Sequence, residues 1–266
     1  MAPPLLPPPT RAIVRLPSSR AADGLTDADL GAPDPEVTAA QHEAYVTALR
    51  DAGLDVTVLP AEEDLPDAHY VEDAAVLLGE DVAVLTRPGA PERRDEPARL
   101  ADALPHPTVV SLADLGGPHA TLDGGDVLVA HDRMLIGVSR RTNEAGARAL
   151  AAIVAEHRAG WPVHLVPFTG VLHLKTGTTE VVPGQLLLAP TMQITDASGL
   201  DGLLQHVVAA ADAYAANVVP LGHTTLVAAG FPDVAALVGR HGPITEVPMG
   251  DFERMDGGLT CLSLRW

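Results

Sequence analysis

The chain carries a single thiol, Cys261, close to its C-terminal end. A thiolate is a strong nucleophile, and a histidine within reach can activate it or serve as general acid and base. His173, in the segment VLHLKTG, is the candidate partner. A lone buried cysteine is more often an inert apolar residue, and a histidine between two leucines is more often a core residue. The paired glycines in MDGGLTCLSLRW favour the nucleophile, because they let backbone approach a ligand closely.

Two acidic clusters run directly into apolar segments. PDAHYVED holds Asp67, Glu72 and Asp73, and ATLDGGD holds Asp123 and Asp126. Most acidic clusters are solvated, but carboxylates at the buried mouth of a strand carry negative charge that is costly without compensation. A planar guanidinium compensates it well, since its donors pair bidentately with carboxylates. A divalent metal ion is the competing ligand, although magnesium or calcium leaves the cysteine and histidine unexplained.

Polar residues recur at the heads of predicted strands. Asp73, Asp126, His173, Asn217 and Cys261 are roughly 45 to 50 residues apart, the period of a blade-sized repeat. If the repeats form a ring, these side chains converge on its axis. For Asn217 and Asp126 an ordinary structural role, a hydrogen bond to turn backbone, is favoured.

Each repeat is predicted to run strand, hairpin, strand, helix, strand. The expected helices, from apolar residues at helical spacing, cover 36–53, 91–104, 143–157, 198–211 and 233–240. The expected strands are 12–16, 55–60, 74–78, 82–87, 108–112, 126–130, 134–139, 163–168, 174–182, 185–190, 217–221, 224–230, 244–249 and 260–266.

The fifth repeat is split between the two ends of the chain. Its first strand is 260–266, and its remaining strand, helix and strand are 12–16, 36–53 and 55–60. Pairing the terminal strands would complete the unit and remove open sheet edges. The expected fold class is therefore α/β, a propeller of five ββαβ modules whose ring is closed by the N- and C-terminal strands.

Composition limits the classes of function. The 266 residues carry a formal net charge of -18, which argues against nucleic-acid binding and suits a cationic small molecule. No run approaches the roughly 20 apolar residues of a membrane span. A lone cysteine rules out an intramolecular disulfide and fits a reducing cytoplasm. The start does not resemble a secretory signal, so residues 1–10 are expected to be a disordered proline-rich tail and 11–266 one domain.

Longer motifs resemble one enzyme family. DGLTDADLG, PDAHYVED, TRPGAPERR, ATLDGGDVL, SRRTNEAGA, LHLKTG and DGGLTCLSLRW occur in the order found in dimethylarginine dimethylaminohydrolases, of the guanidino-group modifying, or pentein, superfamily. The resemblance covers the chain after the proline-rich start and implies a five-module α/β propeller. It also implies hydrolysis of Nω-methylated L-arginine to L-citrulline and methylamine or dimethylamine, without a metal or organic cofactor.

The resemblance implies a role for each matching residue. Cys261 matches the nucleophile, His173 the general acid and base, and Asp123 the carboxylate that orients the histidine or holds the guanidinium. The residues matched to substrate binding are Leu25, Asp67, Tyr70, Glu72, Asp73, Arg93 and Arg141.

Within that set the resemblance separates the two ends of the substrate. Arg93 and Arg141 are similar to the pair that binds the α-carboxylate, with Arg94 and Arg140 as neighbouring alternatives. The backbone oxygen of Leu25 would receive the α-amine. Tyr70 stands beside the alkylated end, where relatives often have Phe.

Other functions remain open at this point. Arginine deiminases act on unsubstituted arginine with similar catalytic residues but are usually longer. A non-catalytic binder of cationic amino acids, or an enzyme that transfers the amidino group to an amine, would use the same acids and arginines. The sequence leaves the oligomeric state undecided, and a homodimer is compatible with it.

Overall fold

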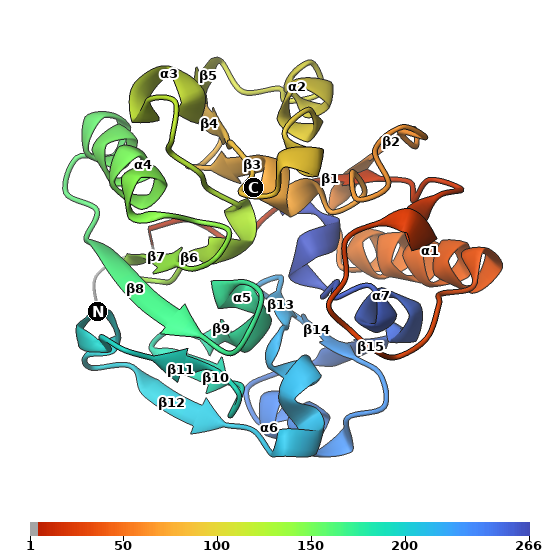
Figure 1. Ribbon diagram of the computed structural model, residues 1–266. Helices are drawn as coiled ribbons and strands as arrows, with labels where there is room; N and C mark the ends of the chain where they lie inside the picture. The colour runs from red at the N-terminus through yellow and green to blue at the C-terminus, as the bar shows by residue number, and fades with distance from the viewer. Residues whose placement is uncertain (1–4) are drawn as a thin grey trace.

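The structure is a computed structural model that describes residues 5–266. Within these residues the strands form five separate sheets, and none of them closes on itself. Figure 1 shows the sheets lying around the middle of the molecule, with the helices α1, α2, α4 and α6 toward the outside. The predicted α/β class is confirmed.

All five sheets contain the same arrangement of three strands. A first strand pairs antiparallel with a second, and the second pairs parallel with a third. Four of these sets are β3 (Ala75–Leu77), β4 (Val82–Leu85) and β5 (Thr108–Ser111); β6 (Val127–Val129), β7 (Met134–Val138) and β8 (Val163–Thr169); β9 (Thr178–Val182), β10 (Gln185–Leu188) and β12 (Leu204–Val207); and β13 (Val219–Pro220), β14 (Thr225–Ala228) and β15 (Ile244–Val247). The short β11 (Gln193–Ile194) adds to the edge of β8.

The fifth sheet joins the two ends of the chain. β16 (Leu264–Arg265) pairs antiparallel with β1 (Arg11–Arg15), with Ala12 opposite Arg265. β1 in turn pairs parallel with β2 (Asp55–Leu59). The C-terminal segment that contains the thiol is thereby held by backbone hydrogen bonds to the N-terminal strand.

The two long helices begin at side chains that cap them. Asp34 accepts hydrogen bonds from the backbone of Glu36 and Val37 at the start of α1 (Pro35–Asp51), and Asn143 accepts one from Gly146 at the start of α4 (Glu144–His157). Such caps satisfy backbone donors that a helix leaves free. The other helices are α2 (Glu96–Ala101), α3 (Leu112–Gly116), α5 (Leu174–Gly177), α6 (Pro232–Gly239) and α7 (Gly250–Arg254). None of the helices in the described part of the chain is long and apolar enough to cross a membrane.

The helix predicted over 198–211 is wrong. That segment forms a 3-10 turn at Ser198–Leu200, the strand β12 and the start of a second 3-10 helix at Ala210–Ala216. Gly202 has a φ of 81°, a left-handed conformation that interrupts a helix. The four residues of β12 gain backbone pairing along β10, and this tertiary pairing outweighs their helical apolar spacing.

A short helical turn precedes the first strand of every sheet. These turns are η2 (Val71–Ala74), η4 (Gly124–Asp126), α5, η6 (Ala210–Ala216) and η7 (Thr260–Leu262). The recurring residues Asp73, Asp126, His173, Asn217 and Cys261 lie in these turns or directly beside them. These residues therefore keep their predicted place at the head of each first strand, although a turn stands where part of the strand was expected in four of the five cases.

The segment before β1 contacts two other parts of the chain. The Leu5 backbone donates to His131 O at 2.8 Å, and the Thr10 backbone donates to Trp266 O at 2.8 Å. Residues 1–4 of the proposed tail lie outside the described residues, and the disordered tail stays a prediction.

Candidate active site

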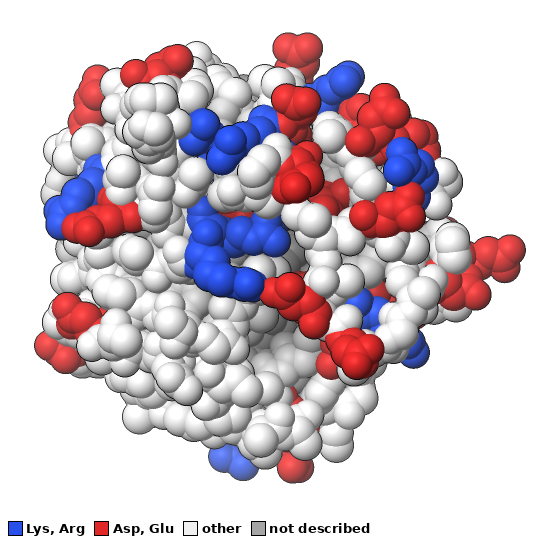
Figure 2. All heavy atoms as spheres, viewed as in Figure 1, with Lys and Arg blue, Asp and Glu red and all other residues white. Residues whose placement is uncertain are grey.

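One small cavity gathers most of the predicted site residues. It has a volume of about 20 Å³ and is lined by Leu25, Asp67, Tyr70, Asp73, Arg93, Arg141, Leu172, His173, Met255, Asp256, Gly257 and Cys261. All predicted site residues except Asp123 and Glu72 line it. Figure 2 shows Lys and Arg side chains gathered beside a hollow in the middle of one face, with acidic side chains next to them.

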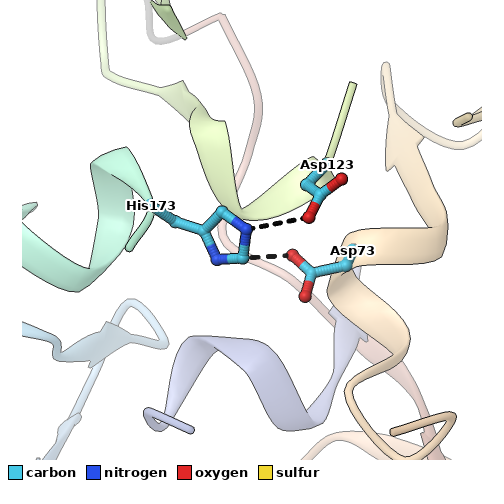
Figure 3. Close-up of side chains that lie close together, drawn as sticks. All are labelled: Asp73, Asp123 and His173. Carbon is cyan, nitrogen blue, oxygen red and sulfur yellow. Dashed lines mark hydrogen bonds and ion pairs between the residues drawn. The ribbon is translucent and has the colours of Figure 1, made fainter. Parts of the chain in front are cut away.

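His173 lies between two carboxylates. Its Nε2 is 2.9 Å from Asp123 Oδ2, and its Nδ1 is 3.8 Å from Asp73 Oδ1; both carboxylates point toward the ring in Figure 3. Burial alone would lower the pKa of His173, but the charge of Asp73 and the hydrogen bond that the ring donates to Asp123 outweigh it and raise the pKa to about 9. The ring is therefore an imidazolium at neutral pH.

Asp123 lies behind the histidine and outside the cavity lining. Its side chain is fully buried, and its second oxygen accepts a hydrogen bond from Gly89 N at 2.8 Å. A carboxylate held in this way fixes the orientation of the ring. Of the two roles open for Asp123, the geometry therefore favours orienting His173 over holding a cation.

Asp73 is held from two directions. Gly125 N donates to Oδ1 at 2.9 Å, and Arg93 Nη1 donates to Oδ2 at 2.7 Å. Position 125 has no room for a side chain, because a Cβ there would lie 2.7 Å from Asp73 and 2.8 Å from His173. Burial would raise the pKa of Asp73, but His173 and Arg93 hold it well below its ordinary value. Asp73 is an anion at the cavity wall.

The guanidinium of Arg93 donates its hydrogen bonds mainly to carboxylates of the protein itself. It forms two hydrogen bonds of 2.8 Å with Glu96, in addition to its bond with Asp73, and it is buried. Burial raises the pKa of Glu96 to about 7, against the opposing charge of Arg93. Sequence reasoning missed Glu96, although its spacing from Arg93 places both on one face of a helical turn.

Arg141 lines the cavity and keeps one buried donor without a hydrogen-bond partner in residues 5–266. Its Nη1 is buried and has no hydrogen-bond partner among the described residues, and Asp123 Oδ2 lies 4.0 Å away. Arg140 is exposed and pairs with Asp27 at 2.5 Å, and Arg94 is exposed as well. In both Arg-Arg pairs, it is the predicted member that lines the cavity.

Asp67, Leu25 and Tyr70 form the rest of the predicted lining. Leu25 N donates to Asp67 Oδ2 at 3.0 Å, which holds the segment after Gly24 against the cavity. Burial raises the pKa of Asp67, although Arg93 opposes the shift. The hydroxyl of Tyr70 donates to Met255 O at 3.4 Å, and the ring packs against Gly257, where a Cβ would lie 2.4 Å from it.

Cys261 lies in the turn η7 and is buried. Its Sγ accepts a hydrogen bond from Gly258 N at 3.4 Å. Burial, followed by the negative charges of Asp73 and Glu72, raises the pKa of the thiol to about 12. The site thus combines a neutral thiol with an imidazolium.

Glu72 lies apart from the other predicted residues. It pairs with Lys175 Nζ at 2.7 Å and with Arg265 Nη2 at 3.2 Å. It lines a separate cavity of about 800 Å³. The 3-10 turn η2 directs Glu72 and Asp73 to different sides, which their adjacency in the sequence did not reveal.

A metal ion competes poorly for this donor set. One ligand atom each of Asp73, Asp123 and His173 lie within 4.8 Å of one another. However, Asp73 is already paired with Arg93, and the His173 ring with Asp123. A metal ion would have to displace these charge-assisted hydrogen bonds, whereas a cation with its own N–H donors could use the remaining lone pairs.

Comparisons with known proteins point to one enzyme family. The family model for eukaryotic N,N dimethylarginine dimethylhydrolase matches residues 34–172. The N(G),N(G)-dimethylarginine dimethylaminohydrolase of Streptomyces coelicolor is 37% identical over 97% of this chain and 97% of its own.

Two solved structures are similar over nearly the whole chain. A DDAH from Pseudomonas aeruginosa, a cysteine-to-serine mutant complexed with citrulline, has a TM-score of 0.90 and 32% identity and covers 97% of this chain and 99% of its own. A histidine-to-glycine dimethylarginine dimethylaminohydrolase, as an adduct with S-methyl-L-thiocitrulline, has a TM-score of 0.89 and 31% identity and covers 97% and 100%. With a matching family model and relatives of this identity along its whole length, the chain belongs to the dimethylarginine dimethylaminohydrolase family.

Proposed function

We propose that this protein hydrolyses Nω-methylated L-arginine to L-citrulline and methylamine or dimethylamine through a covalent adduct on Cys261. The observation that carries the proposal is the single cavity lined by Cys261, His173 and the carboxylates of Asp67 and Asp73. Two relatives support the same chemistry, since one was solved with citrulline and another as an adduct with S-methyl-L-thiocitrulline.

The substrate is proposed to bind with its guanidinium against Asp67 and Asp73. Both carboxylates line the cavity, and a planar guanidinium pairs well with them. The α-carboxylate binds Arg141, whose buried Nη1 is unpartnered among the described residues. Arg93 acts differently from Arg141, because its donors already hold Asp73 and Glu96. Glu72 is directed away from the bound guanidinium toward Lys175.

Substrate binding prepares the nucleophile. The guanidinium brings a positive charge beside a thiol whose pKa is raised by burial and by anions, so it favours loss of the thiol proton to water. The thiolate of Cys261 then attacks the central guanidinium carbon, which gives a tetrahedral adduct. The imidazolium of His173 gives its proton to the methylated amine, and the bond from carbon to that amine breaks.

Hydrolysis of the adduct uses the same histidine, now as a general base. After the amine departs, His173 is neutral and accepts a proton from water as the water oxygen attacks the S-alkylthiouronium carbon. The bond from carbon to sulfur breaks, which releases citrulline and returns the thiol. Asp123 keeps the ring in place through both steps by its 2.9 Å hydrogen bond.

Entry of the substrate requires the cavity to widen. A volume of about 20 Å³ is close to that of one water molecule. The contacts that would separate are the hydrogen bond from Leu25 N to Asp67 and the exposed pair of Arg140 with Asp27, both of which hold the segment after Gly24. The exposed pair is worth little in water, but Asp256 also accepts hydrogen bonds from Thr26 Oγ1 and from the backbone of Asp27 and Ala28, so these contacts would have to separate as well.

The fold is proposed to be a five-bladed α/β propeller formed by residues 11–266 as one domain. Its support is the shared three-strand arrangement of the five sheets and the pairing of β1 with β16. In such a ring the five turns before the first strands face a common axis, which accounts for the meeting of residues so far apart in sequence.

The proposed activity is tested by citrulline release from a panel of guanidines. We expect release from monomethylarginine and asymmetric dimethylarginine, with a matching amount of methylamine or dimethylamine. Much higher kcat/KM for unsubstituted arginine would instead indicate a deiminase, and loss of citrulline when an acceptor amine is added would indicate amidino transfer. Binding without citrulline from any guanidine would leave a non-catalytic binder.

We also predict that kcat/KM rises with pH. This ratio reports the groups of the free enzyme, and the fraction of thiolate increases about tenfold per pH unit while the pH lies below the thiol pKa. The rise should continue until His173, with a pKa of about 9, loses the proton that the departing amine needs. Initial rates of citrulline release across this range check the prediction. A ratio that is constant or falls between about pH 6 and pH 8 would contradict it.

A further inference from the structure

Asn217 occupies the fourth of the five recurring positions and is buried. Its Nδ2 donates to Lys175 O at 2.7 Å and to Thr260 Oγ1 at 3.0 Å. Its Oδ1 accepts a hydrogen bond from Thr260 N at 2.9 Å. Both donors and one acceptor site of the amide are therefore used, and all three bonds lead to two short segments.

Those two segments carry the proposed reacting groups. Lys175 lies in α5, which begins directly after His173, and Thr260 is the residue before Cys261 in η7. One buried side chain thus joins the turn of the imidazole to the turn of the thiol. A hydrogen-bond pattern of this kind fixes both the distance and the rotation between two segments.

The two glycines before the thiol, Gly257 and Gly258, pack too closely against Tyr70 and Asn217 to carry a side chain. A Cβ on Gly258 would lie 2.7 Å from Asn217 Oδ1, and a Cβ on Gly257 would lie 2.4 Å from Tyr70. The paired glycines were first interpreted as giving a ligand access to backbone. In the structure Gly257 does line the cavity, and both glycines also allow the loop before Cys261 to pack on Asn217 and Tyr70. The conformation of this loop therefore depends on the amide.

We propose that Asn217 is a positioning residue, which holds Cys261 in line with His173 through Thr260 and Lys175. The inference rests on the proposed function and extends it, because Asn217 does not line the cavity and touches no reacting atom. Its effect should therefore fall on the chemical steps rather than on substrate binding.

The first test compares Asn217→Ala with Thr38→Val. Thr38 is also buried, and its hydroxyl bonds Asp251 in a part of the fold away from the cavity, so it controls for loss of a buried polar group. We expect Asn217→Ala to lower kcat by about 10- to 100-fold, the effect of a displacement on the order of 1 Å between reacting groups. KM should change by less than about threefold, because the groups that bind substrate are intact. Thr38→Val should keep its kcat.

A second comparison uses Thr260 and does not depend on the alanine variant folding. Thr260→Val removes the hydroxyl that accepts from Asn217 Nδ2, whereas Thr260→Ser retains it. We expect the valine variant to lose kcat and the serine variant to keep most of it. Equal activity of these two variants, or a kcat of folded Asn217→Ala within about twofold of the unmodified protein, would overturn the inference.

Alkylation of Cys261 by iodoacetamide separates this inference from the proposed function. The reagent is neutral and needs no substrate, so the pH dependence of its rate reports the thiol environment directly. We expect Asn217→Ala to shift that profile relative to the unmodified protein, and Thr38→Val to leave it unchanged. Superimposable profiles for all three would count against positioning, whether or not methylarginine is the substrate.

Discussion

Replacement of Cys261 by serine is expected to lower kcat for methylarginine by on the order of 10⁵-fold or more, the effect of removing a catalytic nucleophile. A hydroxyl loses its proton much less readily than a thiol. The burial and the anions that raise the pKa of the thiol to about 12 would act against an alkoxide at the same place. The positive charge of one bound guanidinium can offset the cost of forming a thiolate at this place, but it does not offset the larger cost of forming an alkoxide.

Substrate binding should survive in Cys261→Ser. The groups proposed to bind the guanidinium and the α-carboxylate, Asp67, Asp73 and Arg141, are unchanged, and the hydroxyl is smaller than the thiol. Calorimetric titration with methylarginine measures the affinity, and citrulline release measures the rate. Retention of kcat within about 100-fold would remove Cys261 as the nucleophile, because loss of a catalytic nucleophile costs on the order of 10⁵-fold or more.

The meeting of Cys261 with His173 could be predicted because it depends on order along the chain. Each of the five sheets has one of the recurring residues at the same point, before its first strand, and three of these residues, Asp73, His173 and Cys261, line one cavity. The same argument placed Asp73 at the site. Backbone pairing of β1 with β16 then holds the C-terminal turn near the middle of the molecule, and this too follows from apolar strands at both ends.

The details that were missed depend on the direction of single side chains. Glu72 and Asp73 are neighbours, yet the turn η2 sends one to Lys175 and the other to His173. Arg93 was predicted to bind the substrate α-carboxylate with Arg141, and it does line the cavity, but its pairing with Glu96 three residues later was not predicted. Spacing in the sequence does not determine such directions when turns are short.

Asn217 shows the same limit of sequence-based prediction, because its place in the repeat was predicted but its bonding partners were not. Its position in the repeat was predicted, and a hydrogen bond to turn backbone was expected and is present. Which turns it bonds could not be inferred, because Lys175 and Thr260 are distant in sequence and approach only in the assembled fold.

Replacement of His173 by glycine is expected to separate formation of the covalent adduct from its hydrolysis. Without the imidazolium, the methylated amine has no proton donor, and we expect kcat to fall on the order of 10⁴-fold, the upper range for a general acid and base. S-methyl-L-thiocitrulline carries a thiolate leaving group, which departs without being protonated first. It should therefore load Cys261 in His173→Gly, and the adduct should persist because no base activates water. Intact-mass measurement after mixing detects it.

The controls for this prediction use another buried histidine and the missing nucleophile. His42 is buried in α1, and burial lowers its pKa to about 4, so His42→Ala removes a neutral ring outside the cavity. This variant should turn over methylarginine normally and accumulate no adduct. The double variant with Cys261→Ser should acquire no mass. Free imidazole, which fits the space left by the ring, should speed both loss of the adduct and turnover in His173→Gly. If the adduct decays as fast in His173→Gly as in the unmodified protein, His173 does not activate water, and the base must be sought among Asp67 and Asp73, the other groups at the cavity wall that can accept a proton.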